Sequence, residues 1–322
     1  MSLPSPAMPL PSLFCSEIYQ EVLDLQLGPS SIEVRPMVDK VLVNDSRVLA
    51  NMLKEEKMSQ ADITDYFTPG STVQTSVKPH MRKIVTDWMS EVCQDQQCQP
   101  EVFCHAVNYL DRFLTRLNIN KNQFQLLASV CLLLASKLQG CPISLTTLVD
   151  YTDNSFLPEE IKQWEILVLS VLHWNLNVLT PLSFLNLLLQ HLGLTSLRYQ
   201  VEQLVLVLQT DLEMASSPPS VVAAAATLSI YQNTDPPSKE VENLVQNITK
   251  FVKVSRQDLC SLYIRIQQVV QDQFDQAVLD NTSSEEQSDD KLVVGEEGEY
   301  FLYEQQNDHK QTFSTSFNPL VC

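Results

Sequence analysis

Residues that commonly perform catalysis or bind metal are scattered through this sequence rather than gathered in motifs. None of the five histidines has Ser, Cys or acidic neighbours at a spacing typical of a catalytic or zinc site. The eight cysteines form no Cys-x-x-Cys pair. The six glycines form neither a dinucleotide-binding motif nor a phosphate loop. We therefore expect no catalytic residue, no metal, no cofactor and no enzymatic activity.

Two charged residues occur in apolar helical patterns and could recognise a partner. Lys137 ends the most apolar stretch of the chain, and Glu165 lies in the next long helical pattern. A lysine that emerges from a buried helix needs a partner for its charge. Spacing alone leaves two interpretations open, a functional pair or two solvated side chains, and favours the second.

Two shorter patterns could bind peptides or proteins. Met81, Ile84 and Trp88 follow the spacing of one helix face, which is most often a core face. The same stretch carries a second apolar face that could serve the core instead. The segment Leu13–Glu17 reads Leu-x-Cys-x-Glu within a proline-rich stretch, where an extended peptide could place side chains in a partner's pockets.

Charge and composition exclude several classes of partner. Acidic residues number 39 and basic residues 21, which gives a net charge of −18. Nucleic acid and anionic membrane surfaces attract basic proteins, so neither is expected as a direct partner. No apolar run approaches the ~18 residues of a membrane span. The N-terminus has no basic segment typical of a secretory signal, and the cysteines fit a reduced, intracellular protein.

Helical periodicity runs from residue 80 to about residue 273, so we predict an all-α fold. The scarcity of glycine, 6 residues in 322, argues against a nucleotide-binding α/β fold and against turn-rich sandwiches or barrels. The segments that start near residues 80 and 181 each contain about five helices. The predicted helices cover about 47–58, 81–92, 102–114, 124–138, 145–151, 158–173, 182–192, 197–213, 221–232, 239–250 and 256–273.

This pattern predicts four regions. Residues 1–43 form an extended arm, 44–178 a short helix and a first helical domain, and 179–273 a second helical domain. Residues 274–322 are rich in acidic and poor in apolar residues, which predicts a disordered tail. In the tail Thr282, Ser283 and Ser284 precede two glutamates, an acidic-context phosphorylation pattern that is also frequent by chance.

Several motifs in a fixed order resemble the cyclin box of D-type cyclins. They are His80–Cys93, Asn108–Leu114, Leu126–Lys137, Tyr151–Ser155, Pro158–Glu160 and His173–Leu176. The resemblance covers roughly residues 44–272. It implies two tandem five-helix cyclin-box folds after a short N-terminal helix. It also implies a non-catalytic subunit that binds and activates a cyclin-dependent kinase of the four/six class at the G1/S transition.

The resemblance assigns roles to the charged pair. Lys137 and Glu165 match the residues with which cyclins bind the regulatory helix region of the kinase, through charge-assisted hydrogen bonds. Apolar contacts around the pair would come from Leu138, Leu169, Trp174 and Leu176. The segment 138–142 departs from the family because it lacks the usual acidic residue and is one residue shorter.

The resemblance also assigns two docking sites for substrates and inhibitors. The helix face described above matches the hydrophobic patch that binds Arg-x-Leu peptides of substrates and Cip/Kip-type inhibitors. Its predicted residues are Met81, Ile84, Trp88, Glu91, Phe124 and Gln125, with Glu91 binding the peptide arginine. The motif formed by Leu13, Cys15 and Glu17 resembles the docking motif for retinoblastoma-family pocket proteins.

Three other functions are weighed against this interpretation. One is a cyclin-fold transcription adaptor, although that family is basic and carries a zinc ribbon. Another is a cyclin-fold scaffold that binds retinoblastoma-family proteins with little kinase activation. The third is an enzyme on an all-α scaffold, for which no site is visible.

The family implies nuclear and cytoplasmic localisation, and since no basic import cluster is present, import would depend on a partner. The tail lacks the Thr-Pro degradation switch common in the family.

Overall fold

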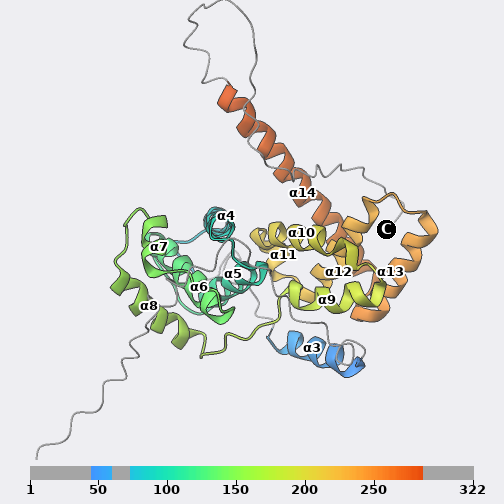
Figure 1. The fold of residues 1–322 in the computed structure, drawn as a ribbon, viewed down its shortest axis with the longest axis horizontal. Coiled ribbons are helices and arrows are strands. Elements are labelled where there is room, and N and C mark those ends of the chain that lie inside the picture. The colour runs from blue at the N-terminus through green and yellow to red at the C-terminus, as the bar shows by residue number, and fades with distance from the viewer. Residues whose placement is uncertain (1–44, 60–72, 286–322) are drawn as a thin grey trace, which may run out of the picture. The chain divides into compact units, whose positions relative to one another are not determined.

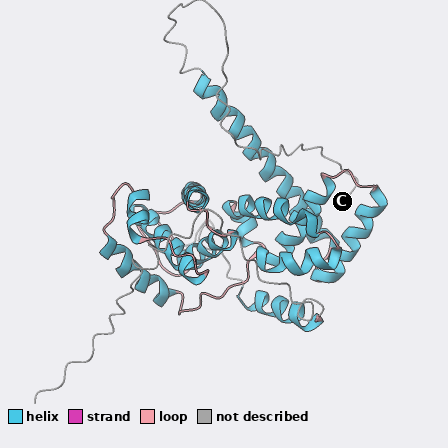
Figure 2. Ribbon diagram, viewed as in Figure 1, coloured by secondary structure: helices cyan, strands magenta, loops and turns pink. Residues whose placement is uncertain are grey.

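The computed structural model describes residues 45–59 and 73–285, with the backbone alone for residue 59 and for residues 274–285. Within these ranges the chain forms helices joined by loops and contains no strand (Figure 2). This confirms the predicted all-α class. The predicted N-terminal arm and residues 286–322 of the predicted acidic tail lie outside the described residues.

The first bundle surrounds one central helix, α6 (Phe124–Leu138) (Figure 1). α6 is apolar on all sides, so it must be covered by neighbouring helices. The side chains from Phe124 to Ser136 are almost all buried, and α4, α5 and α8 pack against the helix. The other helices of the bundle are α4 (Pro79–Asp95), α5 (Pro100–Leu114), α7 (Leu145–Tyr151) and α8 (Pro158–Val171).

The second bundle repeats this plan around α12 (Pro219–Gln232). The four consecutive alanines Ala223–Ala226 are fully buried, and their small side chains let neighbouring helices approach α12. Those neighbours include α9, α10 and α14. The other helices are α9 (Pro181–Leu192), α10 (Arg198–Thr210), α11 (Leu212–Ser216), α13 (Ser238–Val252) and α14 (Arg256–Glu285).

Local sequence signals set many helix boundaries. A proline occupies the first turn of α4, α5, α8, α9 and α12, where its missing N–H costs no helical hydrogen bond. Gly193 ends α9 in the left-handed conformation with φ +71°. Glycine adopts this conformation without the steric cost of a Cβ atom.

The helix predicted over 197–213 is interrupted in the structure. Asp211 adopts an extended conformation (φ −79°, ψ 131°) between α10 and α11. Its carboxylate accepts a hydrogen bond from the backbone N–H of Met214 at 3.0 Å and so caps α11. An aspartate at a helix start competes with the continuous helix that apolar periodicity predicts.

α14 continues to Glu285, past residue 274, where the sequence predicts that the disordered tail begins. No glycine or proline occurs between Arg256 and Glu285, so nothing in the sequence breaks the helix. Thr282, Ser283 and Ser284, the predicted phosphorylation sites, lie in the last turn of α14.

The N-terminal helix α3 (Ser46–Ser59) packs against the core of the second bundle. Leu53 is buried in that core. Glu56 accepts hydrogen bonds from the backbone N–H of Ser220 at 2.6 Å and from its hydroxyl at 2.8 Å. A buried carboxylate of α3 therefore caps the N-terminus of α12, far along the chain.

Candidate partner-binding site

The predicted pair Lys137 and Glu165 is formed in the structure. Lys137 lies in the last turn of α6 and Glu165 in the middle of α8, two helices that pack together. Lys137 Nζ is 3.0 Å from Glu165 Oε1 and 3.3 Å from Oε2, and both side chains are partly buried. A carboxylate offers about four acceptor sites, so Glu165 can hold Lys137 and still accept a donor from a partner.

The four apolar residues predicted around this pair differ in their accessibility. Trp174 is 68% exposed, and Leu138 is also exposed. Leu176 is half-buried and packs against the first core. Leu169 is only 7% exposed and belongs to that core, so it offers a partner little surface.

The exposed Trp174 lies in a constrained turn at the end of α8. His173 and Trp174 both have positive φ, +54° and +58°. The backbone N–H of Trp174 bonds to the carbonyl of Leu169 at 2.9 Å, and that of His173 bonds to Ser170 at 3.1 Å. Two consecutive left-handed residues are unfavourable for side chains with a Cβ atom, so the surrounding structure must hold them in place.

Two side chains of α5 and one just after it hold this turn, and sequence reasoning did not identify them. The Tyr109 hydroxyl donates to the Leu176 carbonyl at 2.7 Å, and Arg112 Nη1 donates to the Asn175 carbonyl at 2.9 Å. Arg116 Nη1 donates to the Val171 carbonyl at 2.6 Å. The available signal was polar side chains within an otherwise apolar helix, since buried donors must find acceptors. Burial lowers the pKa of Arg112, and the neighbouring Arg116 adds to this.

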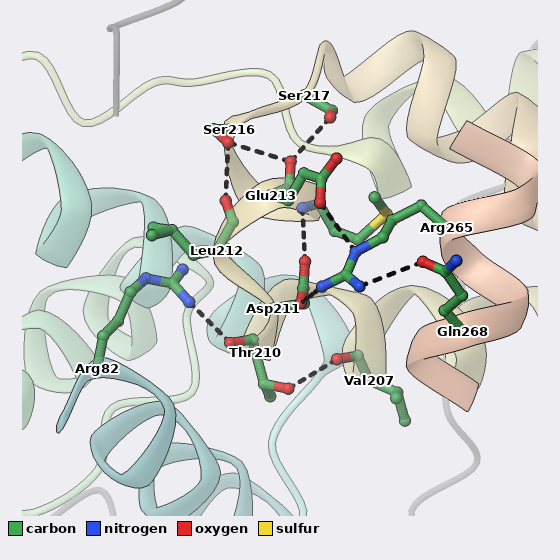
Figure 3. Close-up of polar contacts among 11 residues, drawn as sticks. Arg82, Val207, Thr210, Asp211, Leu212, Glu213, Ser216, Ser217, Arg265 and Gln268 are labelled. Atoms are coloured by element: carbon green, nitrogen blue, oxygen red, sulfur yellow. Dashed lines mark hydrogen bonds and ion pairs between the residues drawn. The ribbon is translucent and has the colours of Figure 1, made fainter. Parts of the chain in front are cut away.

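A second feature that sequence reasoning missed is a fully buried ion pair between Arg82 and Asp111. Arg82 Nε and Nη2 each donate to one Asp111 carboxylate oxygen at 2.7 Å. The guanidinium also donates to the Thr210 carbonyl at 2.8 Å (Figure 3). A second donor bonds to the Gln209 carbonyl at 3.2 Å, also at the end of α10. Arg82 therefore links α4 and α5 of the first bundle to the second bundle.

The predicted docking patch lies mainly on α4. Ile84 is 64% exposed, Glu91 is exposed, and Met81 and Trp88 are half-buried against the first core. Their spacing places them along one face of the helix. α6 packs against α4 and supplies Gln125, which is half-buried.

One predicted member of the patch is placed differently. Phe124 is only 3% exposed and belongs to the first core, so it offers little surface to a docked peptide. Leu13, Cys15 and Glu17 lie outside the described residues.

The described residues contain no group of three or more His, Cys, Asp and Glu side chains that could hold a metal ion. No helix among them is long and apolar enough to cross a membrane.

Two family models match the chain in tandem. The cyclin N-terminal domain matches residues 47–177, and the cyclin C-terminal domain matches residues 179–292. The chain belongs to the cyclin family. The two domain matches follow the order of the two bundles and confirm the predicted tandem architecture.

Similar curated proteins place this cyclin in the D type. G1/S-specific cyclin-D1 of Pongo abelii is 41% identical over 204 residues, 62% of this chain and 68% of that protein. G1/S-specific cyclin-D2 of Xenopus laevis is 37% identical over 226 residues, 67% of this chain and 76% of its own. Cyclin-D1 of Xenopus laevis is 35% identical over 272 residues, 81% of this chain and 91% of its own.

A solved structure supports the fold of this cyclin. The viral cyclin of herpesvirus saimiri superposes with a TM-score of 0.54 at 21% identity, over 64% of this chain and 97% of that chain. Since cyclins are regulatory, non-catalytic subunits of kinases, the chain is a regulatory subunit of this kind.

Proposed function

We propose that this D-type cyclin binds and activates a cyclin-dependent kinase of the four/six class and directs it to retinoblastoma-family substrates at the G1/S transition. The observation that carries the proposal is the Lys137–Glu165 pair, formed between the last turn of α6 and the middle of α8. Glu165 and Leu169 are four residues apart on one face of α8, and Leu169 holds the backbone of Trp174. The ion pair of α8 and the exposed indole in the turn after α8 are therefore neighbours along the chain.

In this mechanism the cyclin activates the kinase by binding to it, and it takes no part in the reaction itself. The charged pair hydrogen-bonds to the regulatory helix region of the kinase, while Trp174 and Leu138 cover adjacent apolar surface. These contacts favour the active placement of the regulatory helix and the activation loop. Phosphoryl transfer is carried out entirely by kinase residues.

Substrate choice is assigned to two other segments. Leu13, Cys15 and Glu17 would bind pocket proteins of the retinoblastoma family as an extended peptide. The face formed by Met81, Ile84, Trp88 and Glu91 would bind Arg-x-Leu peptides of substrates and Cip/Kip-type inhibitors.

We further propose nuclear and cytoplasmic localisation, with import in complex with a partner.

The test separates recognition of the kinase from formation of the internal ion pair. Lys137→Glu is compared with Lys137→Glu/Glu165→Lys, which restores an ion pair of reversed orientation, and with Lys239→Glu, which reverses an exposed charge in α13. Each variant is tested for co-purification with a purified four/six-class kinase. We expect both Lys137 variants to lose binding and Lys239→Glu to keep it. Full binding by the folded double variant would reject the assigned interface.

Substrate direction is measured in the same assay. Cys15→Ala is expected to reduce phosphorylation of a retinoblastoma C-terminal fragment while kinase binding stays unchanged. Unchanged phosphorylation would remove the arm from the proposal. Kinase binding without activity would instead support the scaffold function, for which the altered segment 138–142 is the motivating observation.

A further inference from the structure

Two cysteines meet at the end of α4, the helix that carries the docking face. The backbone N–H of Cys98 bonds to the carbonyl of Cys93 at 2.9 Å, and that of Gln97 bonds to Gln94 at 3.0 Å. Gln97 lies between them in the left-handed conformation, with φ +50°. This is the Schellman arrangement of a helix C-terminus, in which the first and last residues of the motif bring their side chains into contact. The contact is usually apolar, and here it joins two thiols.

The two thiols differ in exposure and in acidity. Both are free, with Cys93 buried and Cys98 half-buried. A hydrogen bond between them lowers the pKa of Cys98 and raises that of Cys93, which burial raises further. Cys98 is therefore the accessible and more acidic thiol, and Cys93 lies beside it as a protected second thiol. This is the usual arrangement of a reactive and a resolving cysteine.

The neighbouring cysteines do not share these features. Cys104 is fully buried, and burial raises its pKa. Cys141 is exposed, but burial of its sulfur and the nearby Cys98 raise its pKa. Among these neighbours, Cys141 could form a disulfide with Cys98 in place of Cys93.

We propose that Cys93 and Cys98 form a reversible disulfide when the protein meets a peroxide. The Cys98 thiolate attacks one peroxide oxygen, the O–O bond breaks, and the departing alkoxide or hydroxide takes up a proton. The resulting Cys98 sulfenic acid is attacked by Cys93, which forms the S–S bond and releases water that carries the Cys93 proton. Two electrons pass from the two thiols to the peroxide.

The backbone is already arranged for this product. The Cys98–Cys93 hydrogen bond fixes the two ends of the motif, and a disulfide forms readily only where the two residues already approach each other. The bond would fasten the turn between α4 and α5. This turn also contacts α7, because Gln96 Nε2 donates to the Tyr151 hydroxyl at 3.1 Å and that hydroxyl bonds to Asp95 at 3.3 Å.

The chain offers convenient cleavage sites for a direct test. The reduced full-length protein is treated with hydrogen peroxide, blocked with iodoacetamide and digested after glutamate and aspartate without reduction. Cleavage after Glu91, Asp95 and Glu101 places Cys93 and Cys98 in separate peptides, residues 92–95 and 96–101. We expect these two peptides to be recovered as one disulfide-linked species that dithiothreitol separates.

Three variants make the result specific. Cys98→Ser is expected to leave Cys93 reduced, and Cys93→Ser to leave Cys98 as a sulfenic acid that dimedone labels. Cys141→Ser, the matched control at an exposed cysteine, is expected to form the Cys93–Cys98 link as the wild type does. Recovery of Cys98 linked to Cys141, or of reduced Cys98 after Cys141 has been oxidised, would overturn the proposal.

Discussion

At the scale of single residues, the most specific feature is the exposed Trp174 held in an unfavourable backbone conformation. An exposed indole and a positive φ at a residue with a Cβ atom both cost free energy of folding. Their combination at Trp174 therefore points to a function for this side chain. Tyr109, Arg112 and Arg116 supply the hydrogen bonds that keep this turn in place. We therefore regard them as positioning residues for the proposed kinase contact.

Arg112→Met is expected to loosen this turn while keeping most of the apolar packing of the side chain. It removes the donor to the Asn175 carbonyl, a charged hydrogen bond worth about 2 kcal/mol. The measurement is hydrogen exchange of the segment 171–176, which should become faster, together with kinase affinity, which should fall by roughly tenfold or more.

The control for this prediction is Lys121→Met, which makes the same kind of change at an exposed lysine in the short helix before α6. Its exchange and affinity should match those of the wild type. Unchanged exchange in Arg112→Met would show that the turn is held without Arg112, by its local backbone bonds and by Tyr109 and Arg116.

At the scale of helices, α3 is attached to the second bundle by the buried Leu53 and by one buried carboxylate, that of Glu56. Burial raises the pKa of Glu56, and the hydrogen bonds from Ser220 lower it in part. A carboxyl whose folded pKa exceeds its unfolded value near ~4.3 holds its proton longer in the folded state. Its contribution to stability is therefore largest at low pH and declines as pH rises through the window between the two values.

Glu56→Gln is expected to keep the cap and remove this pH dependence. The amide oxygen can accept from the Ser220 N–H, and the amide nitrogen can donate to its hydroxyl. The measurement is urea unfolding from pH 4.5 to 7.5. The difference in free energy of unfolding between variant and wild type should shift in favour of Gln as pH rises.

Glu56→Ala provides the comparison, because it leaves the Ser220 donors without an acceptor. A loss of about 1–2 kcal/mol is expected at pH 4.5, and it should become smaller as pH rises, because the wild-type contribution declines. A pH-independent difference for Glu56→Gln would contradict the raised pKa as the source of the effect.

Helix positions were largely predictable from the sequence, because apolar periodicity and proline at first turns are local signals. The break between α10 and α11 at Asp211 was not predictable. It depends on the Asp211 side chain, which caps α11 and pairs with Arg265 of α14 at 2.8 Å (Figure 3). The Lys137–Glu165 pair could be proposed only through the family resemblance. The hydrogen bonds made by Tyr109, Arg112 and Arg116 could not be predicted. Nor could those of Arg82, because all of them depend on carbonyls that distant parts of the chain bring to these side chains.

At the scale of the whole described molecule, Arg82 joins the two bundles. Its guanidinium is fully buried, pairs with Asp111 and donates to carbonyls at the end of α10. Removing one partner of a buried ion pair leaves an uncompensated charge and costs about 3–5 kcal/mol. The same arginine also carries hydrogen bonds between bundles, so its loss should affect their coupling as well as their stability.

Two variants separate these effects. Arg82→Met removes the ion pair and the bonds to Gln209 and Thr210, whereas Asp111→Asn removes one charge and keeps the arginine beside those carbonyls. We expect both to lower the melting temperature in calorimetry. Only Arg82→Met is expected to split unfolding into two transitions, because only it breaks the hydrogen bonds that make the bundles unfold together. A single transition of unchanged sharpness in Arg82→Met would assign the coupling to the packing of α10 on α4 and α5 instead.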